Sequence, residues 1–312
     1  MQTKHVVVEI DQAGQRIDNF LIARLKNVPK SRIYRAIRSG EVRINKKRTK
    51  QTNRLQIGDI VRIPPIQNYS DDAQLQKEVP QSLIEQLEKN IIHEDEYLLV
   101  LNKPSGIAAH SGTGDRWGVI EIMRASRTHQ PFIELVHRID KETSGCLVLA
   151  KTRRSLLDAQ NALQHEQSIK EYTCLVMGQW NVKNKFVDHP IEKQAFQHSA
   201  KMVIHEAGKE AQSRFSALEF FPAHTLMKVS IDTGRTHQIR VHAREEGHPL
   251  VGDKRYGDFE QNRQLTKIGF KRLFLHATYL KLKLMDISQN YEFTAPMPSE
   301  LKGLCRQLRN GL

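Results

Sequence analysis

Short apolar runs after residue 93 are the feature that most constrains the fold. They alternate with polar turns, as strands do, and read YLLVL (97–101), FIELV (132–136), CLVLA (146–150), YTCLVM (172–177), TLMKVSI (225–231) and TYLKLKLM (278–285). Helical spacing of apolar residues is found between them at 117–127, 153–164 and 236–246 only. Many strands with few crossover helices favour an α+β fold over a doubly wound parallel sheet.

The apolar runs are too short for a membrane protein. None exceeds about five residues, whereas a membrane span needs roughly 20, so we expect no membrane partner. The N-terminal residues lack the apolar core and cleavage site of a signal peptide. The three cysteines, Cys146, Cys174 and Cys305, are odd in number and unclustered, which argues against disulfides and structural zinc. We therefore expect a cytoplasmic location.

Charge divides the 312 residues unevenly. Residues 1–65 hold 15 basic and 5 acidic side chains, whereas 66–96 hold 2 basic and 8 acidic ones, within a total net charge of +13. A compact basic block attracts polyanions, and nucleic acid is the obvious partner. We therefore predict an RNA-binding domain over 1–65, a linker with a short helix over 66–90, and a second domain over 91–312.

The basic block has the pattern of a small mixed domain. A strand is expected at 6–10, a helix at 16–25 and a second helix from 29–31 to a stop at Gly40. Alternation at 42–45 predicts a strand, 46–48 a basic turn, and 55–63 a further β element.

This block resembles the S4 RNA-binding domain. The resemblance rests on RIDNFL (16–21), SRIYRAIRSGEVRIN (31–45) and LQIGDIVRI (55–63). It implies two helices and a small sheet that present a basic face to RNA phosphates, which position a protein without reading sequence. The alternative is an ordinary solvated basic helix. The expected RNA-binding residues are Arg16, Lys30, Arg32, Arg35, Arg38, Lys46, Lys47 and Arg48.

Two charged segments carry the candidate chemistry. The loop HRIDKETSG (137–145) lies between two apolar runs, and its Asp140 could be a nucleophile, a general base, a metal ligand or a plain turn residue. A second segment, IDTGRTHQIRVHA (231–243), contains Arg235, His237 and Arg240. A guanidinium and a carboxylate from the two segments would form a charge-assisted pair, because buried charges need partners.

These segments resemble the pseudouridine synthases that modify large-subunit ribosomal and other RNAs. Beyond HRIDKETSG, the matching stretches are LNKPSGIAAH (101–110), KEYTCLV (170–176), TGRTHQIRVH (233–242), GHPLVGDKRYG (247–257) and FLHATYL (274–280). Ile139 and Glu142 are conservative departures from the commoner Leu and Asp. The resemblance implies a catalytic domain built on a mixed, largely antiparallel sheet.

The resemblance also implies the reaction. A uridine would lose its N1–C1′ bond, and the uracil would rotate and rejoin the ribose through C5. Asp140 matches the essential aspartate, acting as a nucleophile on C1′ or the ring, or as a base leading to a glycal. Arg240 matches its paired arginine, which would favour the charged carboxylate, and Tyr172 matches the tyrosine that stacks on the base. The expected substrate-binding residues are Arg138, Thr143, Lys170, Arg235 and His237.

Because the target base must leave its stack, loops and bulges of RNA are natural substrates. The expected partner is 23S ribosomal RNA or a pre-ribosomal particle, and we expect a monomer that needs no metal and no redox cofactor. The stretch GTGDRWG (112–118) resembles a dinucleotide-binding motif, but its glycine spacing is wrong. His237, His242 and His248 lack a carboxylate or cysteine at a metal-ligand spacing. The remaining alternative is a non-catalytic RNA-binding or ribosome-assembly protein on the same fold.

Overall fold

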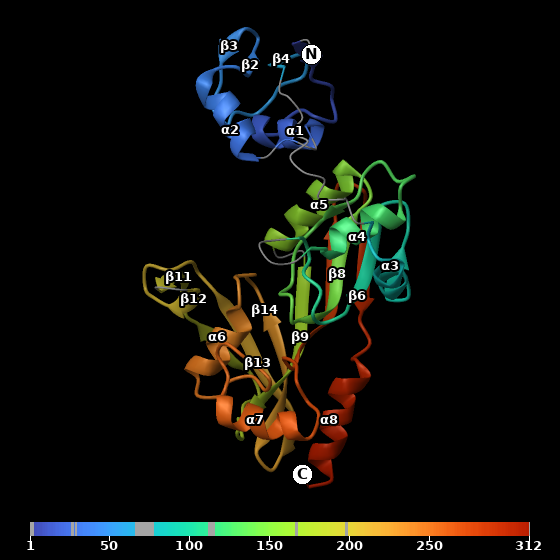
Figure 1. Cartoon of the computed structure of the whole chain (residues 1–312). Coiled ribbons are helices and arrows are strands. Elements are labelled where there is room, and N and C mark those ends of the chain that lie inside the picture. Colours follow the sequence, from blue (N-terminus) through green and yellow to red (C-terminus); the bar gives the residue numbers. More distant parts are fainter. Residues whose placement is uncertain are drawn as a thin grey trace. The chain divides into compact units, whose positions relative to one another are not determined.

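The computed structural model describes residues 3–25, 28, 30–65, 78–111, 116–165, 168–196 and 199–311. The chain forms two compact units, Met1–Glu78 and Val79–Leu312 (Figure 1). The second unit begins ahead of the boundary expected at residue 91, because the helix α3 (Gln81–Glu88) buries Leu87 in its core. Most of the expected linker, residues 66–77, lies outside the described residues, as do the expected helix start at residue 29 and residues 112–115 of the glycine motif.

The first unit packs two helices against a small sheet. The helices are α1 (Ile17–Arg24) and α2 (Lys30–Ser39). The antiparallel sheet has the order β1 (Lys4–Val7), β4 (Ile60–Ile63), β2 (Arg43–Ile44), β3 (Lys47–Arg48). Its core contains Phe20, Leu21, Ile33 and Val61. The first strand begins and ends earlier than the expected 6–10. The Val8 amide donates to the Asp59 carbonyl and the Gly58 amide donates to the Val8 carbonyl, and the chain turns after Val8.

A ten-stranded sheet forms the centre of the second unit. Its order is β10 (Lys185–Asp188), β13 (Gln212–Phe221), β14 (His224–Ile231), β9 (Ser168–Met177), β15 (Leu275–Leu284), β8 (Ser144–Ala150), β6 (Leu98–Lys103), β5 (Ile91–Glu94), with β16 (Gln289–Thr294) on β15 and β7 (Glu134–Leu135) on β8. The strands pair antiparallel except β15 with β8, which is parallel. The α+β fold with a mixed, largely antiparallel sheet is thus confirmed.

Helices cover both faces of this sheet, so β6 and β8 are buried along nearly their whole length, whereas β16 alternates exposed and buried residues. On β8, Cys146 and Val148 pack under α5 (Arg153–Gln164), whereas Leu147 and Leu149 pack under α3 and α4 (Val119–Ser126). In Figure 1, α3 and α4 lie together over β6 and β8. The half around β9 and β14 is covered by α6 (Gln238–Glu245) on one face and by α7 (Phe259–Lys267) and α8 (Ser299–Arg309) on the other.

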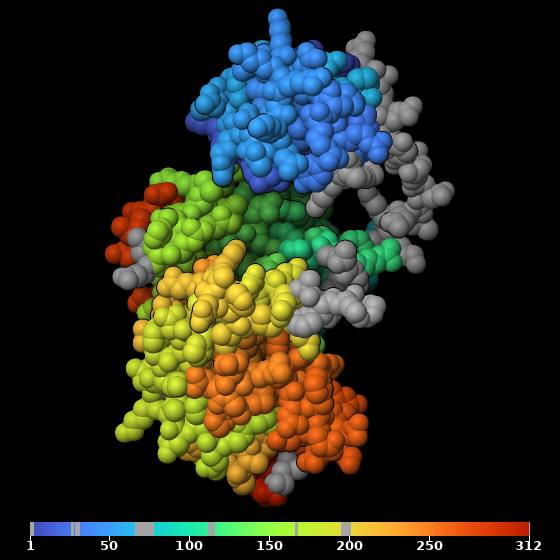
Figure 2. Space-filling model, turned by 90° about the vertical axis from the view of Figure 1, so that its left-hand side faces the viewer, coloured from blue at the N-terminus to red at the C-terminus, as the bar shows by residue number. Residues whose placement is uncertain are grey.

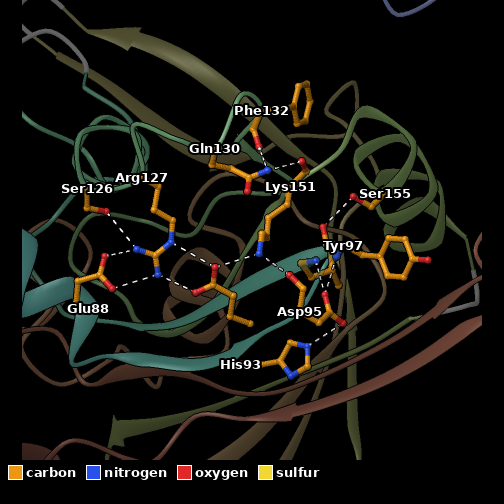
Figure 3. A network of polar contacts seen from close by, with 12 residues as sticks. Glu88, His93, Asp95, Tyr97, Ser126, Arg127, Gln130, Phe132, Lys151 and Ser155 are labelled. Atoms are coloured by element: carbon orange, nitrogen blue, oxygen red, sulfur yellow. Dashed lines mark hydrogen bonds and ion pairs between the residues drawn. The ribbon is translucent and has the colours of Figure 1, made fainter.

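A polar network joins the elements at the end of β8 that is remote from its first residue (Figure 3). Arg127 bonds the carboxylates of Glu88 and Glu94, and Lys151 bonds Glu94 and the Asp95 carbonyl. The Asp95 carboxylate accepts from the Tyr291 hydroxyl at 2.7 Å. These contacts tie α3, α4, β5 and β16 to the turn after β8.

A two-stranded hairpin, β11 (Ile191–Phe196) and β12 (Ser199–Ile204), is separate from the large sheet. It was not expected from the sequence. In Figure 2 it is the yellow segment, and the surface is recessed between it and the green segments of the second unit. In the part of the chain that the structure describes, no helix is both long and apolar enough to span a bilayer.

Candidate active site

Asp140 lies on the loop between β7 and β8, at the edge of the parallel pair of strands. The loop is turned by a hydrogen bond from the Thr143 amide to the Asp140 carbonyl, at 3.1 Å. Gly145 then adopts φ +112°, and a Cβ there would lie 2.1 Å from the Ala277 carbonyl oxygen of β15. Only glycine therefore lets the loop enter β8 at this close approach.

The last residue of β6 and the segment that follows it hold the same loop by hydrogen bonds. The Lys103 ammonium, which has no exposed surface, donates to the carbonyls of Pro104, Ile107 and Lys141 at 2.7, 2.8 and 3.1 Å. The Ser105 hydroxyl donates to the Glu142 carbonyl at 2.7 Å. Burial lowers the pKa of Lys103 to about 7. The backbone that directly follows Asp140 is thus held by hydrogen bonds to the carbonyls of Lys141 and Glu142.

Arg240 on α6 is the buried cation of the site. Its Nη1 lies 3.3 Å from Asp140 Oδ2, while its Nε and Nη2 form a fork–fork pair with Asp253 at 2.7 and 2.8 Å. Glu142 is 3.9 Å from Nη2. Burial opposes ionisation of Asp253, but the hydrogen bonds from Arg240 outweigh it and lower the pKa of that carboxyl. Asp253 therefore fixes the guanidinium, which presents its remaining edge to Asp140.

Tyr172 on β9 completes a pocket of about 440 Å³, including the part open to solvent. Burial and the nearby Asp140 charge raise the pKa of its hydroxyl, so the phenol stays protonated at neutral pH. The rim of this pocket reaches the strand end at residue 231 and the loop at 234–237. Its lining includes Arg138, Asp140, Thr143, Tyr172, Arg235, His237 and Arg240.

His237 comes directly before α6 and has φ +58°. Its Nε2 lies 3.8 Å from Asp140 Oδ2, and its Nδ1 lies 2.8 Å from the Tyr256 hydroxyl. Burial lowers the pKa of His237 to about 4, against the opposing effect of Asp140. The ring is thus neutral at physiological pH.

Three further predicted residues lie around the pocket. Arg138 donates to the Thr236 hydroxyl at 3.2 Å and Arg235 to the Glu210 carbonyl at 2.9 Å; both side chains reach the surface. Lys170 is directed instead to two carbonyls, of Leu163 and Asp232. The structure therefore brings seven of the eight predicted residues to one pocket, and Lys170 lines the adjoining one.

Asp253, Tyr256 and Lys103 were not predicted as site residues. Asp253 and Tyr256 lie within GHPLVGDKRYG and Lys103 within LNKPSGIAAH, so both motifs contain site residues beyond those expected. The available signal for Asp253 was electrostatic, because a buried arginine needs a carboxylate and Asp140 had to stay open to a substrate.

The predicted RNA-binding residues of the first unit divide into paired and exposed ones. Arg16 is bonded to Asp18, and Arg32 to Glu41, at 2.7 and 2.8 Å. Those with exposed side chains are Arg35, Arg38, Lys46, Lys47 and Arg48. The side chain of Lys30 lies outside the described residues. The expected basic turn at 46–48 forms a hairpin, with Asn45 and Lys46 at positive φ and β3 beginning at Lys47.

Comparison with known proteins agrees with this geometry. The family model for RNA pseudouridylate synthase matches residues 97–245, and that for the S4 domain matches 15–61. The chain is 45% identical to ribosomal large subunit pseudouridine synthase C of Pasteurella multocida over 307 residues, covering 98% of this chain and 94% of the relative. The same enzyme of Escherichia coli is 45% identical over 310 residues, covering 98% and 97%.

The chain belongs to the RNA pseudouridylate synthase family. It is thus an enzyme, an isomerase, with an S4 domain. Among solved structures, human RNA pseudouridylate synthase domain containing 4 has a TM-score of 0.59 and 23% identity, covering 73% of this chain and 96% of that one. This likeness supports the fold of the synthase domain. Asp140, Tyr172 and Arg240 lie inside the matched range, whereas Asp253 and Tyr256 lie after it.

Proposed function

We propose that this synthase converts uridine to pseudouridine in large-subunit ribosomal RNA, with Asp140 as its catalytic carboxylate. The substrate assignment is inferred from the relatives, which are named for the large ribosomal subunit and match over nearly their whole length. The observation that carries the role of Asp140 is its position in the pocket, 3.3 Å from a guanidinium that Asp253 already holds. Such a substrate would place the enzyme in the cytoplasm with the ribosomal RNA.

The chemistry is an isomerisation, so no atom is gained or lost. The N1–C1′ bond breaks, the C5–C1′ bond forms, and one proton leaves C5 while one is added to N1. Asp140 is 26% exposed and can reach a nucleotide, whereas Arg240 is 5% exposed and holds the carboxylate. Tyr172 supplies an aromatic face for the flipped base, and Thr143 holds the loop. These residues need no metal or redox cofactor for the steps assigned to them.

The exposed cations would hold the RNA. Arg138 and Arg235 at the pocket rim are placed to contact the strand around the flipped nucleotide, and Lys170 lies behind them. On the S4 unit, Arg35, Arg38 and the turn at 46–48 would contact phosphates. Arg16 and Arg32 would contribute less, since each already has a carboxylate partner.

The test compares Asp140→Asn with the parent on 5-tritiated large-subunit rRNA. Release of tritium from C5 reports turnover, and a filter-binding isotherm reports RNA affinity. We expect the variant to bind RNA as the parent does and to release no tritium. Equal tritium release from the variant and the parent would contradict the catalytic role of Asp140. If the parent itself released no tritium from this RNA, the substrate assignment would be wrong. A transfer RNA of matched concentration serves as the control for substrate class.

A further inference from the structure

The Tyr256 hydroxyl joins the β11–β12 hairpin to the active site. The backbone amide of Met202 in β12 donates to this hydroxyl at 3.0 Å, and His237 Nδ1 lies 2.8 Å from it. An amide can only donate, so the hydroxyl oxygen accepts that bond. The hydroxyl hydrogen then needs an acceptor, because Tyr256 is 3% exposed.

His237 Nδ1 is the acceptor that the geometry offers. Among the described residues, no other group is bonded to the Tyr256 hydroxyl. If Nδ1 carried a hydrogen, two donors would meet the oxygen and the buried hydroxyl hydrogen would have no partner, at a cost of about 1–3 kcal/mol. Nδ1 is therefore unprotonated, and the neutral ring carries its hydrogen on Nε2.

The protonated Nε2 faces the carboxylate of Asp140. Its distance of 3.8 Å from Oδ2 is longer than a hydrogen bond, and such contacts often tighten only when substrate is bound. The ring has little freedom to turn away. The backbone of His237 is left-handed, and the imidazole packs against the Tyr256 ring in a T-shaped contact with 5.4 Å between centroids. Arg240 in turn lies over the Tyr256 ring, 5.1 Å from its centroid.

We infer that His237 is a positioning residue whose Nε2–H orients Asp140, and that Tyr256 sets the tautomer that makes this possible. The inference rests on the proposed function of Asp140. The carboxylate would be held by two donors, Arg240 Nη1 and His237 Nε2, so that its remaining lone pairs point into the pocket. The hairpin, through the Met202 amide, fixes the far end of this chain of hydrogen bonds.

The first experiment reads the tautomer directly. Nitrogen-15 NMR of the full-length protein with labelled histidine distinguishes a protonated from an unprotonated ring nitrogen, and His237→Gln assigns the signals by their loss. We expect His237 to show unprotonated Nδ1 and protonated Nε2, and Tyr256→Phe to mix the two tautomers. A parent with protonated Nδ1 would overturn the inference. Tyr291→Phe, which removes another largely buried hydroxyl, serves as the control and should leave the His237 signals unchanged.

The second experiment separates positioning from binding. Glutamine can place an amide N–H near Nε2, whereas leucine fills similar space without a donor. At saturating enzyme, the single-turnover rate constant should stay within about 10-fold of the parent in His237→Gln and fall about 100-fold in His237→Leu, with RNA affinity unchanged in both. Equal rates in the two variants, or a change confined to affinity, would contradict the inference. Asp140→Asn is measured alongside; if it stays active, the proposed function fails, while the tautomer still tests the Tyr256–His237 chain.

Discussion

At the scale of single residues, the site depends on a buried charge pair that the sequence pattern did not reveal. Asp140 and Arg240 were predicted to be partners, and they are 3.3 Å apart, but the shorter and bidentate contact of Arg240 is with Asp253. The sequence could supply the residue types of this site through its motifs. It could not supply the geometry, because the loops at 137–145 and 247–257 meet only through the tertiary fold.

Replacing Asp253 by asparagine should therefore destabilise the protein and impair catalysis together. The variant leaves a buried guanidinium without its main counter-charge, which typically costs about 3–5 kcal/mol. Chemical denaturation measures the loss, and tritium release measures the activity. As a control, Glu292→Gln breaks the more exposed pair with Lys281 and should leave the free energy of unfolding nearly unchanged, because water screens exposed ion pairs. Equal losses in the two variants would contradict the role assigned to Asp253.

Gly145 gives a second prediction at this scale. In Gly145→Ala the new Cβ meets the Ala277 carbonyl, so the Asp140 loop must shift away from β15. We expect the free energy of unfolding to fall by about 3 kcal/mol and turnover to be lost. The control is Gly269→Ala, which also has positive φ, at +92°, but no atom within 4 Å of the added Cβ; it should cost about 1 kcal/mol and keep activity. An active, stable Gly145→Ala protein would show that the loop tolerates this shift.

At the scale of elements, apolar patterning predicted the helices and strands that carry a strong signal. The helix expected at 153–164 has the observed bounds of α5. The strands β6, β8, β9, β14 and β15 overlap expected strands, with bounds that differ by up to four residues. The strand expected at 132–136 shrinks to the two residues of β7. The hairpin β11–β12 was missed because it lies outside the large sheet and its strands are rich in polar residues.

Two helices were also missed for different reasons. In α7 only Leu265 is buried, so the sequence has no apolar stripe from which a helix could be predicted. In α8, Leu301, Leu304, Cys305 and Leu308 do follow helical spacing and are buried. The sequence pattern therefore does predict this helix, although it was not among the helices expected above.

The polar network at the far end of β8 should contribute to stability without affecting the chemistry. Arg127→Met removes the bonds to Glu88 and Glu94 and leaves both carboxylates without this partner. We expect a loss of about 2 kcal/mol in unfolding free energy. Turnover at a temperature where the variant is folded should equal that of the parent, because Asp140 lies beyond the opposite end of β8. A selective loss of turnover would contradict this separation.

At the scale of the whole molecule, RNA affinity should divide between the two units. Replacing Arg35 and Arg38 together by alanine removes two exposed cations of the S4 unit. We expect weaker rRNA binding and a salt-dependence slope reduced by about 2, with unchanged single-turnover rate at saturating enzyme. The double lysine variant keeps both charges and should keep the slope. An unchanged slope in the alanine variant would place RNA binding elsewhere.

Acid should destabilise the second unit through its buried neutral histidines. Burial lowers the pKa of His276 to about 4, although its bond to the Ala295 carbonyl opposes this. In the unfolded chain this histidine has a pKa near 6.5, so between pH 6.5 and 4 the unfolded chain binds a proton that the folded chain does not. Stability is therefore lost as pH falls from about 6.5 toward 4. At pH 5 the loss for this group is about 2 kcal/mol. Between neutral pH and pH 5, the free energy of unfolding of His276→Gln should fall by about 2 kcal/mol less than that of the parent. An equal fall in both proteins would contradict the assignment of this acid sensitivity to His276.

The parallel pairing of β15 with β8 has a consequence for the order of biosynthesis. His276 and Ala277 support Ser144 and Gly145, where the Asp140 loop enters the sheet. When the ribosome has translated Asp140, Tyr172 and Arg240, it has therefore not yet translated β15, the strand against which the Asp140 loop packs. The nascent enzyme acquires its reactive shape only once β15 has been made, after every residue proposed to touch the nucleotide has already left the site of peptide synthesis.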